Sequence, residues 1–187
     1  MNYFKNSILS ALFILLNFSI LAQTIQIGTQ DNYESISSID EHGFIVKLRI
    51  NELDLQKIKT ESGVFQQINI NGFGKSLDYG NPQLPVYKRL MELPEGANYE
   101  VVILLKKTKL INLAEYGISD FLIPAQLPVP KIENPQIDFQ YQKQTYQSNS
   151  FYRNDLVKII PLGKMRASSI ARLEISPIAY NPKSNTL

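Results

Sequence analysis

Apolar and polar residues alternate in short runs along this chain, and proline, glycine and asparagine separate the runs. In residues 42–50, Phe44, Val46 and Leu48 alternate with positions such as Lys47. A period of two residues is typical of a half-buried β-strand, whose side chains point alternately to its two faces. Similar runs predict further strands at residues 64–70, 86–93, 99–113, 139–146, 156–160 and 171–176.

The main helical signal lies at residues 50–59, where apolar side chains fall at positions 50, 53, 55 and 58. Asn51 is of a residue type that caps helix N-termini, so a short helix competes with other structures here. Many short strands with turn residues between them are typical of antiparallel sandwiches and barrels. We therefore predict an all-β domain, an antiparallel β-sandwich with at most one short helix, preceded by a signal peptide.

Residues 1–22 have the three-part order of a secretory signal peptide. A short polar start carries Lys5, an apolar run covers residues 8–21, and Ala22 offers a small residue for cleavage. The alternative is a membrane anchor, which needs roughly 18 or more apolar residues, and two polar residues interrupt this shorter run. We expect export to the periplasm in transit to the cell surface or exterior, with no membrane attachment after cleavage.

The composition excludes several kinds of binding and catalysis for this chain. The chain has 19 basic residues, 17 acidic residues, one histidine and no cysteine. The charges are interspersed, and the nucleic-acid surface of a binding protein needs a much larger basic stripe, so we predict no nucleic-acid partner. A lone His42 cannot form a metal pair or a Cys–His dyad, and no cysteine is present to act as nucleophile. We predict no catalytic, metal or cofactor-binding residue and a chain that is not itself an enzyme.

Residues 124–135 contain four prolines, at positions 124, 128, 130 and 135. Proline lacks the backbone N–H that a sheet ladder requires, so this stretch is not expected to form a central strand. The pattern predicts an extended surface loop or an edge segment.

Several motifs occur in the order and spacing of a known family. Residues 80–86 read GNPQLPV, residues 93–97 read LPEGA and residues 124–131 read PAQLPVPK. These motifs resemble the gingipain-type pro-domain, which precedes the catalytic domain of secreted bacterial cysteine peptidases. A departure is Arg153, where the family usually has proline. Weaker matches complete the resemblance at Tyr146 and at residues 150–152, 163–166 and 175–182.

The resemblance implies a β-sandwich pro-domain over residues 23–182, with residues 183–187 as the start of a linker to a downstream region. It implies that the chain inhibits the catalytic domain of a caspase-like cysteine peptidase, in cis or in trans, and aids its folding. The full-length precursor would then be the zymogen of a cysteine endopeptidase. The resemblance also implies export by the type IX secretion route.

An extended segment can occupy a peptidase cleft through backbone hydrogen bonds, with one side chain in the specificity pocket. Prolines restrict the unbound segment and lower the entropy lost on binding. The proline-rich stretch is therefore our candidate peptidase-contacting loop, in which Lys131 imitates a substrate side chain. The alternative is a turn that merely connects sheets. The candidate contact residues are Pro124, Ala125, Gln126, Pro128, Pro130 and Lys131.

A second functional hypothesis is a stand-alone secreted β-sandwich module that binds a glycan or a protein at the cell surface. Its basis is a group of aromatic residues that could form a stacking face, although the same residues could fill a core and its rim. A third hypothesis is that the chain is the first part of a full peptidase precursor, with catalysis encoded beyond Leu187. The aromatic group is Phe139, Tyr141, Tyr146, Phe151 and Tyr152.

Overall fold

The computed structural model describes residues 22–40, 43–94, 96, 99–131, 138–166 and 168–187. Strands dominate this part of the chain, and the helical segments are short. The elements are β1 (Gln23–Gln26), β2 (Tyr33–Asp40), β3 (Gly43–Arg49), β4 (Glu52–Thr60), β5 (Gly63–Asn69), β6 (Gly74–Lys75), β7 (Pro85–Leu93), the 3-10 helix η1 (Leu113–Tyr116), α2 (Lys143–Gln147), β8 (Val157–Met165) and β9 (Ser168–Ile175).

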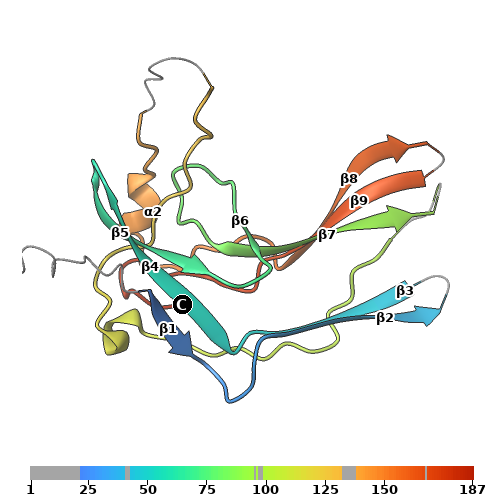
Figure 1. Cartoon of the computed structure of the whole chain (residues 1–187), viewed down its shortest axis with the longest axis horizontal. Helices are drawn as coiled ribbons and strands as arrows, with labels where there is room; N and C mark the ends of the chain where they lie inside the picture. The colour runs from blue at the N-terminus through green and yellow to red at the C-terminus, as the bar shows by residue number, and fades with distance from the viewer. Residues whose placement is uncertain (1–21, 41–42, 95, 97–98, 132–137, 167) are drawn as a thin grey trace, which may run out of the picture.

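The described strands pair in antiparallel sheets of two, three and four strands (Figure 1). The sheets have the orders β2-β3, β1-β4-β5 and β6-β7-β9-β8. Their pairings are antiparallel throughout. The expected all-β antiparallel fold with at most one short helix is confirmed, and the short helix is α2.

The core is built on one face of the β1-β4-β5 sheet. Irregular segments cover that face, chiefly residues 111–122 and 178–187. Burial of these apolar side chains supplies most of the driving force for folding. The buried cluster consists of Ile25, Leu53, Leu55, Ile68, Ile70, Leu84, Ile111, Leu113, Ile118, Leu122, Ile178, Tyr180 and Leu187.

The helix expected at residues 50–59 is wrong, because this segment forms β4. Leu53 and Leu55 are fully buried, and the polar residues between and after them are more exposed, which is the period of a strand. Strands β1 and β5 lie on either side of β4 and satisfy its backbone groups. Tertiary pairing therefore overrides the weak helical spacing.

Two of the expected strands are also wrong. Residues 99–110 form no strand, and η1 begins shortly after them at Leu113. Residues 139–146 contain most of α2 instead of a strand. Conversely, β1 and β2 were not expected, since their polar-rich sequences give little alternation of apolar side chains.

The molecule has two ends of different character (Figure 1). The core end contains β1, β4, β5 and α2. At the arm end, the β2-β3 hairpin and the outer parts of β7, β8 and β9 project as separate arms (Figure 1). Large apolar side chains remain exposed there, including Ile36 on β2 at 52% and Leu90 on β7 at 71%.

Residues 183–187, expected as the start of a linker, belong to the packed body of this structure. Leu187 is buried in the core cluster. Its backbone exchanges hydrogen bonds with Ile111, at 2.9 and 3.0 Å. Asn185 reaches the same region, because its side-chain amide donates to the carbonyl oxygen of Ile118 at 2.8 Å.

Candidate functional site

Two of the sequence motifs meet at the core end of the molecule. The backbone N–H of Gly80 donates to the carbonyl oxygen of Ala125 at 2.8 Å, and the N–H of Ala125 donates to that of Asn81 at 2.9 Å. Next to them, Pro82 pairs with Pro124 in an antiparallel bridge. We call residues 79–82 and 124–125 the socket. The socket thus joins two short segments that lie more than forty positions apart in the sequence.

Gly80 also contacts the part of the chain that returns to the body after residue 138. Its carbonyl oxygen accepts a hydrogen bond of 2.8 Å from the backbone N–H of Gln142. The φ angle of Gly80 is +82°, in the left-handed region that favours glycine. A Cβ atom at this position would lie 3.2 Å from the backbone nitrogen of Gln142. Gly80 therefore joins residues 124–125 to the returning segment at a point where an added side chain would be crowded against the backbone.

The candidate contact residues fall into three groups by burial. Pro124 and Ala125 are buried inside the socket, so the surface loop expected from the sequence does not begin at residue 124. Gln126 is half-buried, and its side chain faces the returning segment. Residues 127–131 are exposed, and they include Pro128, Pro130 and Lys131. Only this outer group is free to meet a partner in the structure as it stands.

The helix α2 supports the socket from the returning side. The hydroxyl of Thr145 donates to the Asn81 side-chain oxygen at 2.6 Å. The hydroxyl of Tyr146 donates to the carbonyl oxygen of Leu122 at 2.7 Å, and the rings of Tyr141 and Tyr146 stack with centroids 4.4 Å apart. Burial raises the pKa of Tyr146 far above its ordinary value, because the charged phenolate is disfavoured away from water.

The aromatic residues between 139 and 152 do not form one exposed face. Tyr146 is buried, while Phe139 and Tyr152 are half-buried. Phe139 stacks on Phe65 with ring centroids 5.5 Å apart. Tyr141 and Phe151 remain exposed, at 40 and 45%. The group is therefore divided between the core, its rim and the surface.

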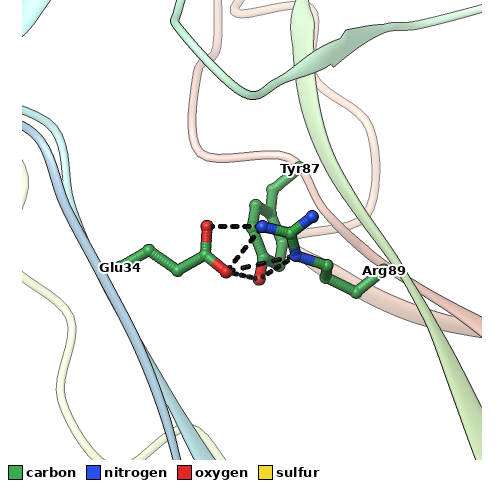
Figure 2. Close-up of polar contacts among 3 residues, drawn as sticks. All are labelled: Glu34, Tyr87 and Arg89. Atoms are coloured by element: carbon green, nitrogen blue, oxygen red, sulfur yellow. Dashed lines mark hydrogen bonds and ion pairs between the residues drawn. The ribbon is translucent and has the colours of Figure 1, made fainter.

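A second polar cluster joins the two arms (Figure 2). Glu34 on β2 accepts a 2.5 Å hydrogen bond from the Tyr87 hydroxyl. The Arg89 guanidinium donates to both oxygens of the same carboxylate, at 2.9 and 3.0 Å. The Tyr87 hydrogen bond and the Arg89 guanidinium lower the pKa of Glu34. Sequence analysis missed this cluster, because 53 residues separate Glu34 from Tyr87 and no local motif connects them.

The described residues contain no group of three or more histidine, cysteine, aspartate or glutamate side chains that could hold a metal ion. They also contain no helix with the length and apolar character needed to span a membrane. His42, the one histidine of the chain, lies outside the described residues. The described part of the candidate site is a segment that backbone hydrogen bonds anchor to the body.

The family can now be assigned from a match that covers the whole described body. The Propeptide_C25 family model matches residues 23–187. The chain belongs to the Propeptide_C25 family. The resemblance to the gingipain-type propeptide found in the motifs is thereby confirmed.

Relatives and solved structures agree with this assignment. The chain is 30% identical over 145 residues to Lys-gingipain HG66 and Lys-gingipain W83 of Porphyromonas gingivalis. These matches cover 77% of this chain and 8% of each relative, so the chain spans a small part of their length.

Two solved structures share the fold. One describes zymogenic latency of gingipain K from Porphyromonas gingivalis, with a TM-score of 0.83 and 26% identity over 89% of this chain and 91% of that one. The other is a complex of the RgpB pro- and mature domains from the same organism. Its TM-score is 0.66 at 21% identity, covering 82% of this chain and 77% of that chain.

Proposed function

We propose that this Propeptide_C25 domain inhibits the catalytic domain of a secreted gingipain-type cysteine peptidase and assists its folding. Residues 127–131 enter the peptidase cleft, and Lys131 takes the place of a substrate side chain in the specificity pocket. The domain acts in cis within a longer precursor or in trans on a separate peptidase.

The observation that carries this proposal is the exposed segment 127–131 on its buried anchor. An inhibitory segment must project from the body of the domain to reach the peptidase. Its first residues must also be held in place, so that little conformational entropy is lost on binding. Burial of Pro124 and Ala125 fixes that start point, and Lys131 stands exposed at the far side. Support also comes from the fold of the gingipain K structure, whose subject is zymogenic latency.

Inhibition can be measured by titrating a mature gingipain-type cysteine peptidase with the chain and following cleavage of a lysine substrate. The unaltered chain should inhibit, and Lys131→Ala should weaken inhibition about 30-fold, as for a side chain that fills a binding pocket. Lys107→Ala removes an exposed lysine away from the socket and should leave inhibition unchanged. A Lys131→Ala chain of full potency would contradict the role of Lys131, and a wild-type chain without effect would contradict inhibition itself.

Assistance in folding is a separate part of the proposal. Refolding a denatured gingipain-type catalytic domain with the chain present in trans should raise the yield of active peptidase. The same amount of heat-unfolded chain is the control. An equal yield with and without the folded chain would exclude this role.

Export completes the proposal, and the apolar run of residues 8–21 supports it. The protein recovered from outside the cytoplasm should begin at Gln23, as measured by the mass of its N-terminal peptide. We expect passage by the type IX route, so a strain lacking that route should retain the protein in the periplasm. An N-terminus at Met1 in the exported protein would argue against cleavage.

A further inference from the structure

We propose that Gln126 is a positioning residue whose side chain fixes both segments of the candidate loop at its base and so orders residues 127–131 for a partner. This inference rests on the proposed function for its biological meaning. It gives a role to Gln126, which belongs to a loop motif in the sequence but is half-buried and hydrogen-bonded to the body in the structure.

The side-chain amide of Gln126 makes a set of bonds that two neighbouring strands would normally exchange. Its Nε2 donates to the carbonyl oxygen of Gln140 at 2.8 Å, and its Oε1 accepts from the backbone N–H of Gln140 at 2.9 Å. Nε2 also donates to the carbonyl oxygen of Pro124 at 3.1 Å. A primary amide can form this pair of bonds because it carries a donor and an acceptor on the same plane, as a peptide group does. We call this arrangement the amide clasp.

The amide clasp is the outermost of several ties between the outgoing and returning segments. Beneath it, Gly80 binds Ala125 on the outgoing side and Gln142 on the returning side, both at 2.8 Å. The hydrogen bonds between the Gln126 side chain and the Gln140 backbone connect the same two segments, one position further along the loop. Beyond the clasp, Leu127 is 41% exposed and Val129 is 67% exposed. Among the described residues, the hydrogen-bonded base of the loop therefore ends at Gln126, and the exposed segment begins at Leu127.

A segment fixed at its base samples fewer conformations, and restricting the unbound state reduces the entropy lost on binding. Gln126 suits this task because it is half-buried, where hydrogen bonds compete less with water than on an open surface. Its loss should loosen the segment without removing any side chain from the apolar core. Local opening and global unfolding can then be told apart experimentally.

The test compares Gln126→Ala with Gln140→Ala in the full chain. Gln140→Ala is a matched control, since Gln126 uses only the backbone of Gln140, and the Gln140 amide instead donates to the carbonyl oxygen of Asp138 at 3.1 Å. Trypsin is added to the free chain, and mass spectrometry follows the cut after Lys131. The cut after Lys107, in the exposed segment 99–110, is the internal reference.

Gln126→Ala should speed the cut after Lys131 about tenfold, which corresponds to the loss of a few partly solvated hydrogen bonds. Gln140→Ala should change it less than about twofold, and the cut after Lys107 and the melting temperature should stay constant in both variants. An unchanged cut after Lys131 in Gln126→Ala would overturn the proposal. So would an equal increase at Lys107, because that result indicates general destabilisation.

A second measurement tests the purpose of the clasp. Gln126→Ala should weaken inhibition of a mature gingipain-type peptidase about tenfold, with Lys131 intact. Faster cutting with unchanged inhibition would overturn the positioning role. Absence of inhibition by the unaltered chain would refute the proposed function, and the trypsin comparison would still decide whether Gln126 orders the segment.

Discussion

The core end and the arm end of this domain both carry large apolar side chains, which are buried at the core end and exposed at the arm end. At the core end, Leu55 on β4 is completely buried, and the chain is tied by backbone bonds between distant segments. At the arm end, Leu90 on β7 is 71% exposed. Residues 101–105 are 42, 65, 54, 71 and 77% exposed, and residues 99–110 make no backbone hydrogen bond to other described residues.

The difference shows where a rigid interaction element can be built. A loop presents a side chain at a fixed position only if its base is held by packed structure. The candidate loop leaves the body at the socket, beside α2, whereas residues 99–110 make no backbone hydrogen bond to other described residues. Exposure alone therefore does not identify the site. Residues 99–110 and 127–131 are both exposed, but among the described residues only 127–131 follow a base that hydrogen bonds hold to the body.

The largest expected contrast is between two leucines. Leu55→Ala should lower the free energy of unfolding by about 2–5 kcal/mol, since it leaves a cavity in the core. Leu90→Ala makes the same chemical change at the arm end and should cost no more than about 0.5 kcal/mol. Urea unfolding of both variants checks this. Equal costs would show that the arm end is as well packed as the core end.

A smaller effect is expected at the socket. Gly80→Ala places a side chain at a φ of +82° and a Cβ 3.2 Å from the nitrogen of Gln142. The left-handed conformation costs about 1–2 kcal/mol, and the close contact adds to it. Gly72→Ala is the control, because Gly72 has a φ of +79° but no atom within 4 Å of the added Cβ. A cost for Gly80→Ala no greater than that for Gly72→Ala would mean that the contact with Gln142 can relax freely.

Much of the fold could be predicted from the sequence, and the exceptions have physical causes. The runs of β3, β5, β7 and β9 alternate clearly enough to identify them. The segment of β4 combines a period of two with a helix-like spacing, and only its neighbours β1 and β5 decide between the two. Local periodicity does not contain that information.

The site was predicted only in part, for a similar reason. The prolines and Lys131 indicated an extended exposed segment, and residues 127–131 are exposed. The burial of Pro124 and Ala125 depends on pairing with residues 79–82, which no local pattern reveals. The sequence offered one indirect signal, since both stretches lie in motifs of the same family.

The smallest effect on stability is expected where the two arms join. The hydrogen bond from Tyr87 and the Arg89 guanidinium lower the pKa of Glu34 below its ordinary value of 4.5. The carboxylate therefore contributes stability above about pH 4.5, and this contribution is lost as pH falls through the lower folded pKa. The side chain is 35% exposed, so solvent screening keeps the effect small.

This prediction is checked by acid unfolding. The wild-type chain should lose stability relative to Glu34→Gln as the pH falls below about 4.5. Glu61→Gln removes a carboxylate from the exposed β4–β5 turn and should keep the wild-type pH profile. If Glu34→Gln followed the wild-type profile through the acid range, the cluster would not tie the arms together.

The most direct test of the central claim is hydrogen exchange of the chain, free and bound to a mature gingipain-type cysteine peptidase whose catalytic cysteine is blocked. The reporting amides are those of Leu127, Val129 and Lys131, because Pro128 and Pro130 have no N–H. We predict slower exchange at these amides in the complex and unchanged exchange across residues 101–105. Protection confined to residues 101–105, or none at residues 127–131, would contradict the account.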